Sequence, residues 1–452
     1  MIRRSVLTGS ATFGLLVAFP SVALAHGIGG RLDLPVPVSF FVVAAAAVLV
    51  LSFVVLSLMW PEPRFQDGPR HEPSSISIRR RGFAATFGVV ALLLVIGQLI
   101  PPLLGLETDP TRPTIAPVMV WVVFWLVVPF AGAVIGDWYT DLNPWRTLAR
   151  TLRIGETDRP HVTTRAGVWP AAAGFVAFTW LELVHPSSGS PVTLGVAALV
   201  YTLALMAAMA FVGRETGLAT FDVFTPYNRL ISAISPVGRR EDGRLIWRGW
   251  LRALTVVPQW PGLAFFVIVA IGTVSYDGAS GTKWFFDTFS IFGRSRSGST
   301  LLLLASVAAV GLAYYLASWM AARLGSGLWT AGQVASRFAH SLVPIALAYA
   351  VAHYLTLILF EGQQLISAIS DPFALGWDLF GTAEWKIDFF ITAVEPIWYA
   401  QVGVLVLGHI LGVVLAHDRA LVDFGIDAVR SQYAMLLLMV ALTASGLLIL
   451  SG

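Results

Sequence analysis

Histidines within apolar stretches are the residues of this sequence best suited to chemistry. The chain has eight His and no Cys, so a metal ion would have to bind imidazole, carboxylate or thioether groups rather than thiolates. An ionisable side chain at membrane depth costs about 3 kcal/mol or more, and such residues commonly mark functional sites. Each intramembrane His is therefore a candidate ligand or proton carrier.

Two of these histidines share one apolar stretch. His340 and His353 would lie about 20 Å apart along a helix axis, at about 1.5 Å per residue, so they cannot bind one ion. Two stacked haem groups would place axial histidines at such a separation, although both imidazoles face the same way only if Pro344 kinks the helix. His340 and His417 fall at the same membrane boundary and are the candidate haem b ligands.

His409 lies on the next apolar stretch, between Gly408 and Gly412. This GxxxG spacing permits the close approach of a neighbouring helix. We predict that His353 and His409 stand on antiparallel helices and share a divalent metal ion, zinc or copper. Simple packing of His409 against its neighbours is the structural alternative.

Five further residues extend this set of candidate site residues. Glu361 ends the first of these apolar stretches and is a candidate catalytic carboxylate, and Tyr349 is a candidate proton donor. Glu182 and His185 would lie on one helix face, a spacing suited to metal binding. His26, as a free N-terminus, would offer an amine and an imidazole to Cu(II).

The composition places these residues in a membrane. Of the 452 residues, 56% are hydrophobic and 12% are charged, whereas about a quarter of the residues of a soluble domain are charged. The net charge of +3 comes from arginines that gather between the apolar stretches, which is a topology pattern rather than a nucleic-acid interface. A water-soluble globule and a nucleic-acid-binding protein are therefore excluded.

Apolar stretches long enough to cross a bilayer recur along the chain. Residues 1–25, with Arg3, Arg4 and the sequence Ala23-Leu24-Ala25, are typical of a cleaved signal peptide. Residues 26–452 then form a single integral membrane domain, an all-α bundle. We expect spans at about 36–60, 83–106, 117–138, 167–184, 193–213, 256–274, 299–322, 338–360, 396–416 and 433–451.

Arginines in alternate loops predict the orientation of these spans in the plasma membrane. The loops 61–82, 140–166 and 214–255 are rich in Arg and should be cytoplasmic, which leaves the mature N-terminus and the C-terminus outside. The loop 214–255 mixes Arg with Trp, as an interfacial amphipathic helix does. The acidic loop 361–395 should form a partly helical cap on the outer face.

Four segments of the sequence are similar to a known family. The run from His26 to Pro37, the tripeptide Asn143-Pro144-Trp145, and the segments Phe338–Tyr354 and Gly408–Leu421 occur in this order. Together they resemble actinobacterial polytopic membrane proteins labelled fenitrothion hydrolase.

The resemblance implies hydrolysis of apolar organophosphate triesters but assigns no catalytic residue. Such a substrate partitions into lipid, and its hydrolysis would be helped by a metal ion that lowers the pKa of a bound water. Haem b or copper-binding electron transfer and transport are the alternatives, and a partner subunit is compatible with each.

Overall fold

The chain folds into a multi-pass helical bundle. The computed structural model describes residues 37–65, 72–77, 81–239, 244–293, 295–325 and 327–451, so the expected signal peptide and His26 lie outside the described residues. Within these ranges, nine helices are long and apolar enough to cross a bilayer, and a bent helix pair raises the number to ten. The predicted all-α membrane bundle is confirmed, and each predicted span overlaps one of these segments.

Several spans are built from consecutive helical segments. The spans are α1 (Val38–Met59); α2 (Arg81–Ile96), η1 (Gly97–Leu99) and α3 (Ile100–Leu103); α4 (Ile115–Pro117), η2 (Val118–Val127) and α5 (Val128–Ile135); α8 (Pro160–Ala166) with α9 (Trp169–Leu183); α10 (Pro191–Val212); α14 (Leu263–Ser280); α16 (Arg296–Leu324); α17 (Ala331–Phe338), η3 (Ala339–Leu342) and α18 (Val343–Leu359); α20 (Val394–Phe424), η5 (Gly425–Asp427) and α21 (Ala428–Ser431); and α22 (Tyr433–Ser451). The segment η2 is a π-helix.

Shorter elements lie at the two ends of the bundle. The arginine-rich end holds β1 (Glu72–Ser77), α6 (Tyr139–Leu142), α7 (Pro144–Thr151), α11 (Arg214–Thr220), α12 (Phe224–Ser232), β2 (Val237–Arg239), β3 (Arg244–Trp247) and α13 (Arg252–Thr255). The opposite end, here called the acidic end, holds α15 (Lys283–Gly293), η4 (Glu361–Gln363) and α19 (Gln364–Ser370).

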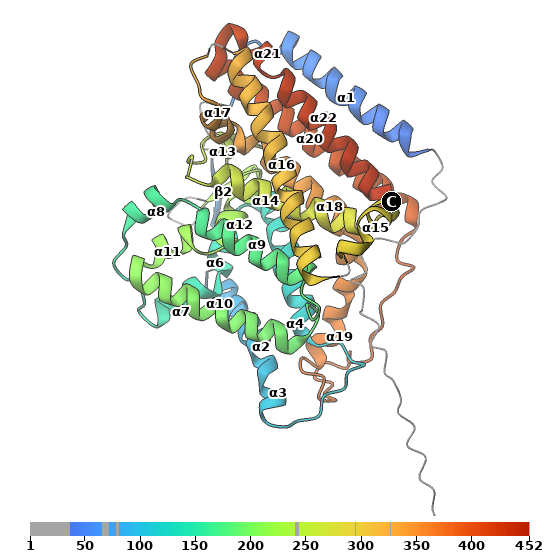
Figure 1. Cartoon of the computed structure of the whole chain (residues 1–452). Helices are drawn as coiled ribbons and strands as arrows, with labels where there is room; N and C mark the ends of the chain where they lie inside the picture. Colours follow the sequence, from blue (N-terminus) through green and yellow to red (C-terminus); the bar gives the residue numbers. More distant parts are fainter. Residues whose placement is uncertain are drawn as a thin grey trace, which may run out of the picture.

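The helices α14 and α18 occupy the centre of the bundle. The helices α1, α16, α20 and α22 pack together on one side, whereas α2, α9 and α10 lie on the other (Figure 1). In the most apolar stretch of α14, 72% of the residues are buried, against 17% in α1 and in α10. Ionisable residues on α14 and α18 are therefore shielded from lipid.

Close packing of α18 against α20 follows the predicted small-residue spacing. A Cβ atom at Gly412 would come within 2.9 Å of the carbonyl oxygen of Ser341, and Gly408 similarly abuts Pro344 and Ala348. The backbones of α18 and α20 are therefore in close contact at Gly408 and Gly412, where larger side chains would hold the helices apart.

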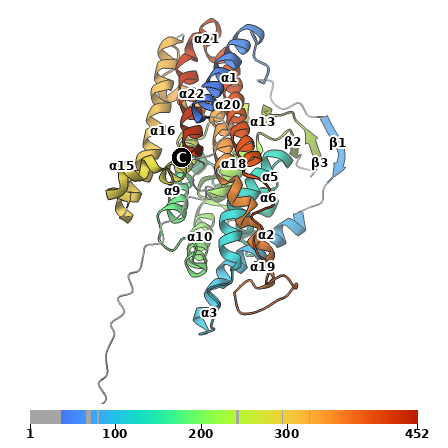
Figure 2. The ribbon, with the colours of Figure 1, turned by 90° about the vertical axis from the view of Figure 1, so that its right-hand side faces the viewer.

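The prediction of an interfacial helix at 214–255 is wrong. This segment forms α11, α12, the hairpin β2–β3 and α13, and β3 pairs antiparallel with both β1 and β2. Figure 2 shows the small sheet at the side of the bundle, next to α5 and α6. Gly213 and Gly249 adopt positive φ, which breaks a continuous helix. The apolar face of α12 turns inward and buries Phe224, Tyr227 and Leu230.

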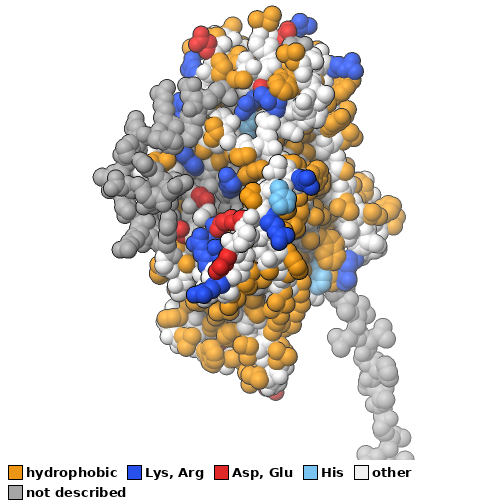
Figure 3. All heavy atoms as spheres, turned by 90° about the vertical axis from the view of Figure 1, so that its left-hand side faces the viewer, with side chains coloured by type: hydrophobic (Ala, Val, Ile, Leu, Met, Phe, Trp, Pro, Cys, Tyr) orange, Lys and Arg blue, Asp and Glu red, His pale blue; other side chains and the backbone are white. Residues whose placement is uncertain are grey.

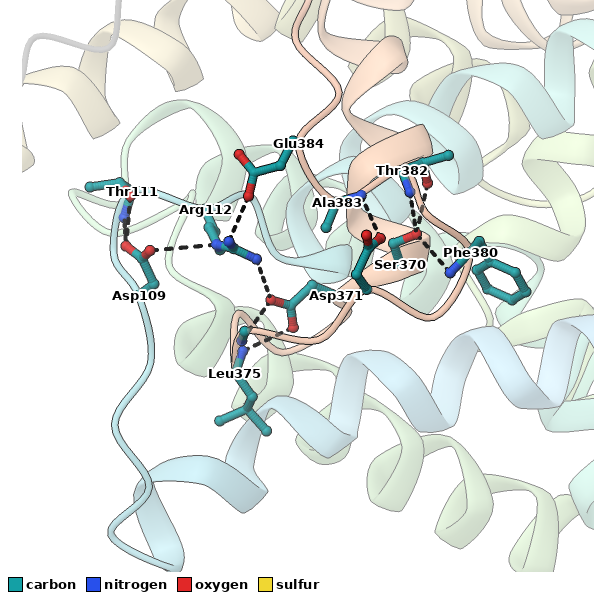
Figure 4. A network of polar contacts seen from close by, with 12 residues as sticks. Asp109, Thr111, Arg112, Ser370, Asp371, Leu375, Phe380, Thr382, Ala383 and Glu384 are labelled. Atoms are coloured by element: carbon teal, nitrogen blue, oxygen red, sulfur yellow. Dashed lines mark hydrogen bonds and ion pairs between the residues drawn. The ribbon is translucent and has the colours of Figure 1, made fainter.

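Arg112 holds two loops together at the acidic end. The cap predicted there is partly helical. Arg112 contacts Glu384 at 2.6 Å, Asp371 at 3.4 Å and Asp109 at 3.5 Å (Figure 4). The backbone N–H of Ile115 also donates to the carbonyl of Pro372 at 3.1 Å. The loop after α19 is thus held onto the loop that precedes α4.

Candidate functional site

An imidazole and a carboxylate meet inside the bundle. The Nε2 atom of His353 on α18 lies 2.8 Å from Oδ2 of Asp277 on α14. Their side chains are 10% and 7% exposed. Because an uncompensated charge at membrane depth is costly, this mutual contact is what makes both residues stable there.

Tyr354 and Glu182 complete a group that we call the polar cluster, which consists of Glu182, Asp277, His353 and Tyr354. The phenol of Tyr354 lies beside the Asp277 carboxylate, and its ring centroid is 4.7 Å from that of His353. Glu182 on α9 lies close enough to Asp277 for the two carboxyl groups to interact electrostatically, and its buried Oε2 has no hydrogen-bond partner among the described residues.

The polar cluster is suited to holding and moving protons. A carboxylate bonded to one ring nitrogen of a histidine fixes the orientation of the ring and leaves the other nitrogen to act as a base. A void of ≈ 10 Å³ next to His353 is lined by Tyr349, Leu405 and Gly446, and about this volume admits one water molecule.

The predicted metal partner His409 points to different neighbours. Its Nδ1 lies 2.8 Å from the carbonyl oxygen of Leu405 on its own helix, and its ring packs against Tyr349 with centroids 5.9 Å apart. The Tyr349 hydroxyl in turn donates to the carbonyl of Leu442. Among the described residues, no three His, Asp or Glu side chains converge as metal ligands. The zinc or copper site predicted from His353 and His409 therefore gains no support.

The candidate haem ligands also contact protein groups. His417 has Nε2 at 3.1 Å from the carbonyl of Trp60 and Nδ1 at 3.2 Å from the Gln432 amide, so both ring nitrogens are engaged. His340 lies in the 3-10 turn η3, with Nδ1 at 2.9 Å from the carbonyl of Arg337. The Nε2 atom of His340 is buried without a hydrogen-bond partner among the described residues.

The remaining predicted residues contact different neighbours. Glu361 bonds to Gln364 in the turn that follows α18. The expectation that Glu182 and His185 share a helix face is wrong, because α9 ends at Leu183. Pro186 disfavours helical geometry at the residue before it, and the ring of His185 instead packs on Trp180.

Sequence reasoning missed Asp277 and Tyr354. The predicted span ended at Val274, where polar residues lower the hydropathy, but α14 continues to Ser280 and carries Asp277 into the bundle. Extending the helix by one turn would have placed this carboxylate at membrane depth.

A large apolar cavity lies beside the polar cluster. Its volume is about 640 Å³, and its walls come from α2, η2, α9, α10 and the start of α12. Phe178 lines it and also packs against Trp125, with ring centroids 5.2 Å apart. Trp125 in turn stacks on Tyr227 at 5.1 Å. An aromatic wall therefore separates the cavity from the polar cluster.

A buried carboxylate anchors the cavity at the arginine-rich end. Asp222 is fully buried and accepts hydrogen bonds from the hydroxyls of Tyr201 at 2.6 Å and Thr225 at 2.5 Å, and from the Asn143 amide at 3.2 Å. Burial raises the pKa of Asp222, and these hydrogen bonds oppose the change. With every contact internal, Asp222 serves to hold α12 and α10 together.

Comparison of the chain with known protein families, with curated proteins and with solved structures finds no match.

Proposed function

We propose that this protein is a membrane-embedded carrier that takes an apolar small molecule from the bilayer, with protons exchanged at the polar cluster. The observation that carries the proposal is the 640 Å³ cavity. Ligand pockets of about 300–1,000 Å³ suit small organic molecules. The wall is almost entirely apolar, so the favoured ligand is uncharged and lipid-soluble.

The exposure of the apolar cavity to lipid and the ionisable residues of the nearby polar cluster support a carrier. Phe87, Val196 and Val200 line the cavity and are 43%, 47% and 59% exposed on the surfaces of α2 and α10. A molecule dissolved in the bilayer would enter between these helices. Ionisable residues that pair within a membrane commonly form proton relays of transporters. Trp125 packs against Phe178 of the cavity wall and lies beside Tyr354 of the polar cluster.

The test uses two alanines of α10 that differ in their position. Ala197 lines the cavity, whereas Ala207 is exposed and does not. A dialkyl aryl thiophosphate triester is a suitable apolar probe, because Trp145 and Trp180 line the cavity and report its binding by fluorescence. In protein reconstituted into lipid nanodiscs, Ala197→Phe should lose probe binding and Ala207→Phe should retain it. Equal binding by the two variants would refute the proposed cavity site.

Hydrolysis of the apolar triester is the second candidate, favoured by the Asp277–His353 pair and the water-sized void beside it. His353 would take a proton from water, the hydroxide would attack phosphorus, and the aryloxide would leave. Release of the phenol by the wild type, lost in His353→Gln while probe binding persists, would favour the hydrolase. Binding without release of phenol by the wild type would favour the carrier.

A further inference from the structure

A second cavity lies at the arginine-rich end and shares no lining residue with the apolar cavity. Its volume is about 480 Å³. It lies between the α5–α6 connection, α7, α12 and the segment after β3. The charged residues of its lining are Asp137, Asp141, Arg146, Arg150, Arg229 and Arg248.

Two of these arginines lack a carboxylate partner within the described part of the chain. Arg248 donates through Nε to the carbonyl of Ser235 at 3.1 Å and through Nη2 to the carbonyl of Ser232 at 2.5 Å. The guanidinium of Arg229 stacks on Trp260, 4.6 Å from the ring centroid. Partial desolvation of the two guanidinium groups lowers their pKa and the Asp137 carboxylate opposes the change, but arginine stays charged in proteins.

The other two arginines of the cavity contact a carboxylate that lies outside its lining. Glu215 contacts Arg146 at 2.5 Å and Arg150 at 3.8 Å. Asp137 accepts hydrogen bonds from the hydroxyl of Thr140 at 2.6 Å and from its backbone N–H at 3.1 Å. The lining thus holds four arginines against two carboxylates, Asp137 and Asp141, and Arg229 and Arg248 are the two arginines without a direct carboxylate contact among the described residues.

The cavity also has an apolar border toward the lipid. Ala85 at the start of α2 lines it together with Val256, Val257 and Pro258, and Val256 is 50% exposed. On the face drawn in Figure 3, Lys and Arg side chains gather together with Asp and Glu side chains, and hydrophobic side chains adjoin them. A charged headgroup would meet the arginines while its acyl chains stay on the apolar border.

We propose that Arg229 and Arg248 bind a phosphate group in this cavity, supplied by an anionic phospholipid or by the free anion. The planar guanidinium matches phosphate oxygens through paired charge-assisted hydrogen bonds. Basic pockets between helices at a membrane surface recognise anionic headgroups by this chemistry. The site is independent of the proposed carrier function.

The test compares two arginines that each stack on a tryptophan. Arg323 lies 5.3 Å from the Trp319 ring centroid, is exposed like Arg229, and does not line the cavity. Thermal unfolding of the purified full chain in detergent would be followed while phosphatidylglycerol, diacylglycerol or inorganic phosphate is added at constant ionic strength. Phosphatidylglycerol should stabilise the wild type and Arg323→Gln against thermal unfolding. Arg229→Gln should need at least about tenfold more lipid to reach the same stabilisation.

The remaining outcomes identify the source of the phosphate or overturn the site. Stabilisation by phosphatidylglycerol alone assigns the site to a lipid, and equal Arg229-dependent stabilisation by inorganic phosphate assigns it to the free anion. Equal response of Arg229→Gln and the wild type, or equal stabilisation by diacylglycerol, overturns the proposal.

A second pair of variants covers a failure of Arg229→Gln to fold. Val256→Glu adds a carboxylate at the border of the cavity, whereas Leu152→Glu adds one to an exposed position outside it. Only Val256→Glu should weaken the response to phosphate groups, and an equal response of the two variants again overturns the site.

Discussion

At the scale of single residues, the contact between His353 and Asp277 stabilises two ionisable groups at membrane depth. Removing one partner of a buried pair leaves the other uncompensated, so His353→Leu and Asp277→Leu should each lower the free energy of unfolding by roughly 3 kcal/mol. The double variant should lose less than the sum, because neither group then remains alone. Thermal unfolding of the four proteins measures this coupling, and additive losses would show that the two side chains act separately.

His409 gives the opposite expectation. Its Nε2 is buried without a hydrogen-bond partner among the described residues. Replacing His409 by an apolar residue of similar size removes the cost of burying the unsatisfied Nε2, and the Nδ1 atom loses only a contact with a carbonyl of its own helix, so His409→Leu should keep or raise the melting temperature. Metal analysis of the wild type and the variant provides the check, and loss of a bound metal ion in His409→Leu would restore the predicted shared site.

The sequence indicates which residue types are unusual but not where their side chains point. The intramembrane positions of His353 and His409 follow from hydropathy alone. The partner of His353 does not, because Asp277 is far away in sequence and its helix outlasts the apolar stretch. The rotation of a helix about its axis is set by packing with its neighbours, and this packing directs His409 toward Tyr349.

At the scale of elements, Asp222 fixes the inward turn of α12. Asp222→Asn replaces an acceptor by an amide whose NH2 group would face donors such as the hydroxyl of Thr225 and the Asn143 amide. Unsatisfied buried groups cost about 1–3 kcal/mol each, so Asp222→Asn should destabilise the protein strongly. Asp287→Asn, at an exposed ion pair with Lys283, is the control and should change the melting temperature little. Similar melting temperatures for the two variants would contradict this role of Asp222.

The loop at the acidic end depends on Arg112. The side chain of Arg112 is 28% exposed, so its ion pairs are partly screened by solvent, and exposed pairs contribute about 0–1 kcal/mol. Arg112→Gln should therefore leave global stability nearly unchanged while releasing the 371–384 segment locally. Limited proteolysis should cut this segment faster in Arg112→Gln than in the wild type, and high salt should narrow the difference. Unchanged cleavage would indicate that backbone hydrogen bonds, rather than the ion pairs of Arg112, hold the loop in place.

Spans were predictable because a bilayer demands about 20 apolar residues in helical form. The residues at which helices end were harder to predict from the sequence than the spans themselves. The helix α9 stops before His185, and the 214–255 segment, read as a surface helix, sends α12 inward because Phe224 and Tyr227 pack with the aromatic residues of η2. These outcomes depend on partners distant in sequence, which a local pattern does not contain.

At the scale of the whole molecule, the orientation in the membrane stays a prediction from arginine placement. The chain has no Cys, so one introduced thiol reports one position. Leu379→Cys at the acidic end and Leu152→Cys at the arginine-rich end replace leucines that are 59% and 62% exposed. In intact cells, an impermeant maleimide should label Leu379→Cys and spare Leu152→Cys, because the positive-inside rule places the arginine-rich end in the cytoplasm. The reverse pattern would invert the topology.

The π-helix η2 stands between the apolar cavity and the polar cluster. Val120 and Val123 line the cavity, whereas Trp125 packs on Tyr227 toward the interior. A π-helix closes i→i+5 hydrogen bonds, so it is wider and rises less per residue than an α-helix. Rewinding η2 into α-helical geometry would lengthen the span and turn its side chains about the axis. A molecule that displaced Val120 or Val123 in the cavity would therefore rotate η2 about its axis and move Trp125 on the opposite side of the helix.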